Sequence, residues 1–186
     1  GLPQLVATAV EEMWHASNVA FDLCPLLTQG AIEAIELSGS QVLKDTFLPK
    51  MVEGVWTGTM NLTEPQAGSD LAAVRTRAVP QPDGSYKLYG QKIFITYGEQ
   101  DYTENISHLV LARTPTAPEG VKGISLFIVP KVLVNDDGSL GARNGIFCSR
   151  LEHKMGIHAN ATCQMELEGA VGSLVGTPNK GLQAMF

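Results

Sequence analysis

The spacing of hydrophobic residues changes near residue 55, and this change limits which folds are possible. Before it, apolar residues recur at every third or fourth position, from Leu5 to Phe21 and again over residues 29–39, as in amphipathic helices. After it, stretches that alternate with a period of two are separated by turn residues. Helices followed by strands favour an α+β fold, with N-terminal α-helices and then an antiparallel β-barrel or sandwich, over a doubly wound sheet.

The same pattern predicts three segments. Residues 1–54 are expected to form part of an N-terminal helical domain, residues 55–170 a β domain of about six or seven strands, and residues 171–186 the start of a truncated C-terminal helical domain. The chain begins with Gly1 and stops at Phe186, where the apolar face of a new helix has just begun. We therefore expect a fragment of a longer protein.

Local signals predict where several elements begin and end. Gly39 is expected to close one helix and Ser40 to cap the next, which Pro49 either ends or extends by one short turn. The sequence "QPDG" at residues 81–84 predicts a hairpin turn, residues 91–96 a separate strand, and residues 135–145 a long polar connection. A late strand should place Cys163, Met165 and Leu167 on one face.

Composition and charge exclude several functional classes. The 186 residues are 44% hydrophobic and 17% charged with a net charge of −6, which favours a globular protein and gives nucleic-acid binding no support. Apolar runs are too short to span a bilayer. The cysteines Cys24, Cys148 and Cys163 form no CxxC pair and predict buried thiols in a reducing, cytoplasmic compartment. His153 and His158 lack the spacing of a helical metal pair, so no metal is expected.

A polar loop at residues 61–70, "NLTEPQAGSD", follows a predicted strand and is longer than an ordinary turn. Backbone N–H groups near Gly68 and Ser69 could form a concave donor cluster for an anion such as a phosphate. The hydroxyls of Thr63 and Ser69 add neutral donors. In the alternative interpretation this is only a turn, in which Asp70 caps the next segment.

A second candidate stretch is "GQKIFIT" at residues 90–96. Phe94 and Thr96 are two residues apart, so they lie on one face of a regular strand. A flat heteroaromatic ligand could stack on Phe94 and accept a hydrogen bond from Thr96. In the alternative interpretation Phe94 belongs to the core and Thr96 ends the strand.

The two stretches together resemble the acyl-CoA dehydrogenase family. The resemblance extends to "WTGTMNLTEP", "HLVLAR", "GISLFIVP", "LEHKMGIHANATCQMELEGA" and "VGTPNKGLQAMF", and so covers residues 40–186. The sequences of these stretches are most similar to the 3-methylmercaptopropionyl-CoA dehydrogenase-like subgroup. They are also similar to the alkylation-response relatives. This resemblance implies a middle β domain that binds FAD against C-terminal helices.

Residue by residue, the resemblance implies a set of flavin contacts. Ser69 would also touch the acyl-CoA, and the Thr96 hydroxyl would lie near flavin N5. Phe94 stands where the family often has Trp, and Tyr97 where it usually has Asn. The full set of cofactor-binding residues implied in this way is Met60, Asn61, Leu62, Thr63, Gly68, Ser69, Phe94, Ile95 and Thr96.

The implied reaction is α,β-dehydrogenation of an acyl-CoA thioester, with electrons passed to an electron-transfer flavoprotein and the full-length protein a homo-oligomer. The base is expected in the C-terminal helical domain, so neither Glu64 nor Glu99 is assigned as catalytic and the fragment alone should be inactive. One alternative is a flavoprotein of the same fold with altered chemistry, of the alkylation-response or nitroalkane oxidase type. Another is a non-enzymatic β-barrel binding module.

Overall fold

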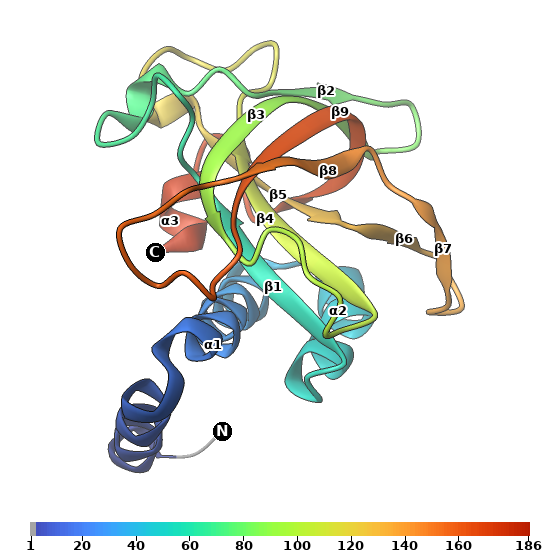
Figure 1. Ribbon diagram of the computed structural model, residues 1–186. Helices are drawn as coiled ribbons and strands as arrows, with labels where there is room; N and C mark the ends of the chain where they lie inside the picture. Colours follow the sequence, from blue (N-terminus) through green and yellow to red (C-terminus); the bar gives the residue numbers. More distant parts are fainter. Residues whose placement is uncertain (1–2) are drawn as a thin grey trace.

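The computed structural model describes residues 3–186, in which helices precede a β-sheet domain (Figure 1). The predicted α+β class is confirmed; residues 1 and 2 of the predicted first segment lie outside the described residues. The helices are α1 (Gln4–Ser38), α2 (Gln41–Val52) and α3 (Gly181–Met185), with 3-10 turns η1 (Leu71–Ala73) and η2 (Val121–Gly123). The strands are β1 (Trp56–Asn61), β2 (Arg77–Pro80), β3 (Tyr86–Thr96), β4 (Asn105–Ala112), β5 (Ser125–Pro130), β6 (Val132–Val134), β7 (Leu140–Arg143), β8 (Ile146–Leu151) and β9 (Thr162–Val175).

The main sheet has the order β1-β4-β5-β9-β3-β2, and β8 also pairs with β9. Its ladders are antiparallel except for β1 and β4, which run parallel, contrary to a purely antiparallel prediction. A single parallel bridge joins Arg77, at the start of β2, to Arg113 just after β4. The far edge of the sheet therefore returns towards its beginning, but the described strands do not close into a barrel.

Two hydrophobic clusters lie on the two faces of β4 and β5. Leu109 and Leu111 face the cluster that includes the helices, whereas Val110 and Ala112 face the cluster beneath β3 and β9. All residues of β4 and β5 are buried, and apart from Asn105, Ser107, His108 and Ser125 they are apolar.

The helices dock on β1 through a close backbone approach. The Gly58 N–H donates to Thr28 Oγ1 at 3.1 Å. A Cβ at Gly58 would lie 2.4 Å from the Ala31 Cβ, so only glycine allows α1 to approach this closely.

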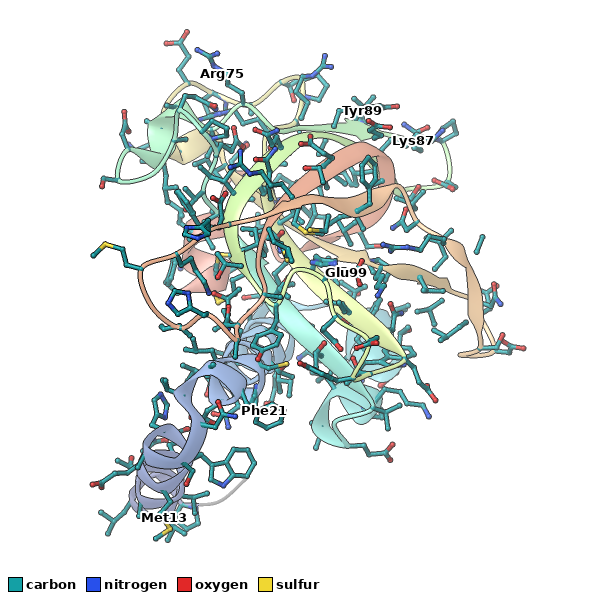
Figure 2. All side chains as sticks on the ribbon, in the orientation of Figure 1. Met13, Phe21, Arg75, Lys87, Tyr89 and Glu99 are labelled. Atoms are coloured by element: carbon teal, nitrogen blue, oxygen red, sulfur yellow. The ribbon has the colours of Figure 1, made fainter. Side chains whose placement is uncertain are left out.

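Helix α1 is longer than either predicted helix. It runs through Pro25, and its break lies at Asn18 (φ −160°, ψ 81°), within the stretch predicted to be one continuous helix. The N-terminal half projects from the sheet, with Met13 66% and Phe21 48% exposed (Figures 1 and 2). The apolar face of residues 5–21 is thus largely uncovered in the described chain.

The predicted boundaries near residue 40 are confirmed in part. The Leu43 N–H donates to Ser40 Oγ at 3.4 Å, so Ser40 caps α2. Gly39 ends α1 in an extended conformation, where a Cβ would lie 2.5 Å from the Ile35 carbonyl oxygen. Of the two alternatives at Pro49, the short extension is confirmed, because α2 continues through it for one turn to Val52.

The strands show both successes and errors of the sequence analysis. The hairpin turn is confirmed by a hydrogen bond from the Gly84 N–H to the Gln81 carbonyl, and the inward face of β9 is confirmed by the burial of residues 163, 165 and 167. Residues 91–96 are not a separate strand but the end of β3. The predicted polar connection contains β7, which pairs with β6, and β8 was missed.

Candidate functional site

The polar loop after β1 folds back on itself as a very short hairpin. Glu64 and Ala67 exchange two backbone hydrogen bonds of 2.9 and 3.0 Å. This reversal brings Gly68 beside Thr63, because a Cβ at Gly68 would lie 4.0 Å from Thr63 Cγ2. Asp70 then accepts a hydrogen bond from the Ala72 N–H at 3.0 Å and caps η1, as the turn interpretation predicted.

Strand β3 lies directly against this loop. The Ile93 N–H donates to the Thr63 carbonyl at 2.9 Å, and Lys92 Nζ donates to the Leu62 carbonyl at 3.0 Å. The two stretches singled out in the sequence are therefore neighbours in space at residues 62–64 and 92–93.

A β-bulge turns Phe94 outwards at this contact. The pairing of β3 with β9 shifts register between Lys92 and Ile95, which are both buried although they are three residues apart. Phe94 has φ 60° and is 59% exposed, so it is not a core residue. A left-handed conformation costs a non-glycine residue about 1–3 kcal/mol, and such residues cluster at functional sites.

Several hydrogen-bonding groups at these segments have no partner in the part of the chain that the structure describes. The hydroxyls of Thr63, Ser69 and Thr96 make no side-chain hydrogen bond within residues 3–186. In the same range, the N–H groups of Gly68 and Ser69 donate to no acceptor. Gly68 and Ser69 are exposed, and Thr63 and Thr96 are half-buried, so a ligand can reach these donors.

The other residues of the implied set point into the protein. Met60 and Leu62 pack against the helix-side cluster, and Ile95 is 2% exposed in the second cluster. Asn61 is buried, and its Nδ2 donates to Thr59 Oγ1 at 2.7 Å. The side chains of Asn61 and Ile95 are buried, whereas those of Met60 and Leu62 are half-buried.

A buried ion pair between Glu64 and Lys92 joins the two segments, and the sequence analysis missed it. Lys92 Nζ lies 2.8 Å from Glu64 Oε1, and the two side chains are 0% and 3% exposed. Burial acts to raise the pKa of Glu64, but the charge of Lys92 and hydrogen bonds from Lys92, Thr76 and Arg75 N–H outweigh it and lower the pKa. Burial lowers the pKa of Lys92 to about 8, despite the opposing charge of Glu64.

This geometry makes Glu64 unsuitable as a proton-abstracting base. Its oxygens accept hydrogen bonds from the Lys92 ammonium, the Thr76 hydroxyl, the side chain of Gln66 and the N–H groups of Arg75 and Thr76. The only sequence signal for the pair was a lysine inside an otherwise apolar strand end, "KIFI".

The middle of the chain is similar to a known protein family. Residues 59–170 match the family described as acyl-CoA dehydrogenase, middle domain. The chain belongs to the acyl-CoA dehydrogenase family.

The relatives are much longer than this chain. It is 55% identical over 186 residues to a 3-methylmercaptopropionyl-CoA dehydrogenase of Ruegeria pomeroyi and covers 100% of itself but 32% of that protein. It is 42% identical over 194 residues to a butyryl-CoA dehydrogenase of Syntrophomonas wolfei, again covering 32% of the relative. A crystal structure of an acyl-CoA dehydrogenase from Bacillus anthracis complexed with FAD superposes with a TM-score of 0.76 and 27% identity, over 99% of this chain and 29% of that one.

A second buried polar group joins β4 to β1 next to the loop. His108 Nδ1 is 2.8 Å from Thr59 Oγ1, and burial, aided by the charges of Arg143 and Lys131, lowers the pKa of His108 to about 3. The Thr59 hydroxyl thus hydrogen-bonds to both His108 Nδ1 and the Asn61 amide, and the three side chains form one buried polar cluster. The Asn61 Oδ1 atom is buried and has no hydrogen-bond partner within residues 3–186.

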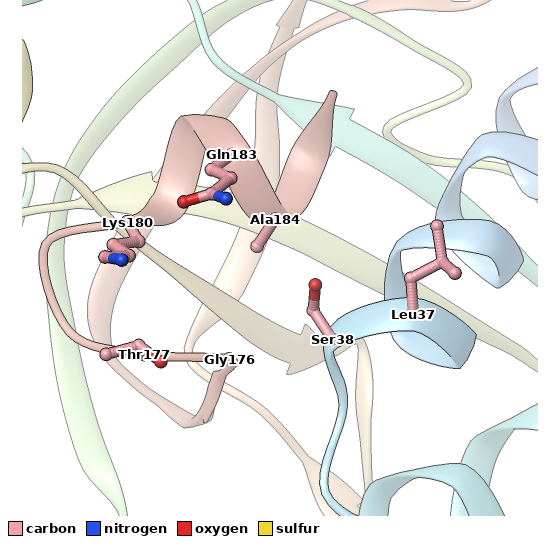
Figure 3. Close-up of a pocket in the computed structure, with 7 residues that line it drawn as sticks. All are labelled: Leu37, Ser38, Gly176, Thr177, Lys180, Gln183 and Ala184. Carbon is pink, nitrogen blue, oxygen red and sulfur yellow. The ribbon is translucent and has the colours of Figure 1, made fainter.

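Two cavities lie away from these residues. One of about 370 Å³ lies between the end of α1 and the connection from β9 to α3, lined among others by Ser38, Thr177 and Lys180 (Figure 3). Another of about 610 Å³ follows α1. Neither is lined by any of the nine implied flavin residues. Within residues 3–186, no helix is both long and apolar enough to cross a bilayer.

Proposed function

We propose that the whole protein catalyses FAD-dependent α,β-dehydrogenation of an acyl-CoA thioester. The observation that carries this proposal is the hydrogen bond between Ile93 and Thr63, which holds the polar loop against the bulge that exposes Phe94. The relatives named as acyl-CoA dehydrogenases and the related structure complexed with FAD support the same chemistry.

The chain's own groups fit a flavin. The unpartnered N–H groups of Gly68 and Ser69 would bind the diphosphate, and the hydroxyls of Thr63 and Thr96 would donate to the ring system. The exposed ring of Phe94 offers a stacking surface. Backbone atoms of the remaining implied residues, Met60, Asn61, Leu62 and Ile95, would line the site. When bound, FAD accepts the hydride from the β carbon of the substrate.

We place the catalytic base outside this chain, in a C-terminal helical domain that begins within residues 171–186. Residues 1–54 and 55–170 would then be the preceding helical and β domains, and the flavin would lie between the β domain and the C-terminal helices. Ser69 would touch the acyl-CoA. Hydrogen bonds to the thioester carbonyl would acidify the α proton, so that a carboxylate suffices as the base.

We further propose an electron-transfer flavoprotein as acceptor and a homo-oligomeric whole protein. A cytoplasmic location stays a prediction; Cys24, Cys148 and Cys163 are free thiols in the structure.

The test is the flavin spectrum of the purified whole protein during titration with a panel of acyl-CoA thioesters. We expect a yellow protein whose flavin absorbance bleaches with at least one thioester. Flavin that no thioester bleaches would favour the altered chemistry of an alkylation-response or nitroalkane oxidase type. A colourless protein would favour the binding module.

Two further measurements locate the site. Thr96→Val should slow flavin reduction more than it weakens acyl-CoA binding, whereas Thr96→Ser, which keeps the hydroxyl, should retain the rate. The isolated chain should hold FAD weakly or not at all, since the proposed second wall is absent. Tight stoichiometric flavin in the isolated chain would contradict a site between domains.

A further inference from the structure

The Glu64–Lys92 ion pair lies at the junction of the two segments that would hold the flavin. Glu64 follows Thr63 in the polar loop, and Lys92 lies two residues before Phe94 in β3. Glu64 and Lys92 are 28 residues apart in sequence, and both side chains are almost fully buried. The pair thus links the two segments from side chain to side chain, beside the backbone hydrogen bond from Ile93 to Thr63.

Both members are also fixed to their surroundings. Lys92 Nζ donates to the Leu62 carbonyl at 3.0 Å as well as to Glu64. Glu64 accepts from the Thr76 hydroxyl at 2.6 Å and from the Arg75 N–H at 2.8 Å. A displacement of either charge would therefore move the loop, the end of β3 or both.

The bulge in β3 begins directly after Lys92. In a regular strand Lys92 and Phe94 would lie on the same face, because side chains alternate. Here Lys92 is buried and Phe94 is 59% exposed, because the register shift lies between them. A slip by one residue would exchange the two faces. Because Lys92 and Ile95 are both buried although they are three residues apart, the extra residue of the bulge lies between them, and Phe94 is exposed.

We propose that the Glu64–Lys92 pair is a positioning device that holds the bulge at Ile93 and Phe94 in the arrangement that binds the flavin. This inference rests on the proposed function. Buried ion pairs can often be replaced by apolar residues without loss of stability, so energy alone does not account for this pair. Burial opposes the charge of Lys92, as the lowering of its pKa to about 8 indicates.

The experiment uses the whole flavin-loaded protein and compares Lys92→Met, Glu64→Gln and the double variant. Lys131→Met, which breaks a different Lys–Glu pair, is the matched control. Urea unfolding measures stability, fluorescence titration measures the Kd for FAD, and stopped-flow absorbance measures flavin reduction by an acyl-CoA. All FAD measurements are made where circular dichroism shows a folded protein.

The double variant separates positioning from stability, because it contains no unpaired buried charge. We expect each single variant to raise the Kd for FAD by roughly tenfold to a hundredfold, as small misplacements do at other sites. The double variant should recover stability relative to Lys92→Met without recovering FAD affinity or the reduction rate. Lys131→Met should keep the native Kd.

A double variant with native FAD affinity and native reduction rate would overturn the positioning role. If Lys92→Met does not fold, Glu64→Gln still tests the positioning role, since glutamine keeps the shape of glutamate and one acceptor oxygen. A native Kd for FAD and a native reduction rate in Glu64→Gln would also contradict that role. A wild-type protein without flavin would overturn the proposed function together with this inference. If acyl-CoA reduces the flavin of the wild-type protein, and the variants keep the wild-type Kd for FAD and reduction rate, this inference alone would be overturned.

Discussion

Two ionic clusters in this molecule use the same residue types in opposite surroundings. The Glu64–Lys92 pair is buried at the loop after β1, with five further hydrogen bonds to its two charged groups. Glu99, by contrast, pairs with Lys131 and with Arg143 at 3.1 Å, where the three side chains are 20–43% exposed. The second cluster ties the segment after β3 to the β6–β7 hairpin. The difference indicates that the first pair fixes a geometry, whereas the second adds little energy.

The largest expected contrast is in stability. Lys92→Met should lower the free energy of unfolding by ~3–5 kcal/mol, because it leaves the Glu64 carboxylate buried without its counter-charge. Lys131→Met should lower it by less than ~1 kcal/mol, as for other partly exposed pairs. Urea unfolding of both variants measures the difference. Equal losses would show that burial does not distinguish the two clusters.

The second largest effect is expected in the acid dependence of the unfolding free energy, to which Glu64 contributes. Its pKa is lowered in the folded protein from the usual 4.5. The unfolded chain therefore binds more protons below about pH 4.5, so this stabilisation is complete above that pH and is lost as the pH falls through the lower folded pKa. Glu64→Gln should flatten the fall in unfolding free energy that occurs as the pH drops below about 4.5. An unchanged acid slope would contradict the assignment.

Salt should produce the smallest effect. Double-mutant cycles on Glu99 and Lys131 should give a coupling of about 0.2–1 kcal/mol at low salt. This coupling should shrink at 1 M NaCl, where the Debye length is about 3 Å. The corresponding cycle on Glu64 and Lys92 should change little, because solvent ions do not reach the pair. Equal salt sensitivity would place water between Glu64 and Lys92.

Elements with a local cause could be predicted from the sequence. The cap at Ser40, the turn at residues 81–84 and the alternation along β9 each depend on residues close together in the chain. At Pro49 the sequence left two alternatives open, and α2 continues to Val52, where Phe47 and Met51 pack in the helix-side cluster.

Features with a non-local cause were missed. The parallel pairing of β1 with β4 and the bulge in β3 depend on strands distant in sequence. For the site, the sequence and the family resemblance indicated both segments, and the structure brings the parts at Thr63 and Ile93 together. The flavin contacts themselves stay predictions. Nothing local could show that Glu64 and Lys92 meet, since a pairing over 28 residues is set by the fold.

The position of β9 has a consequence for synthesis on the ribosome. This strand comes last in the chain, yet it pairs with β3, β5 and β8. Until residues 162–175 leave the exit tunnel, the nascent strands β3 and β5 present open edges to other polypeptides. We expect these open edges to favour aggregation of the nascent chain until β9 has paired with them.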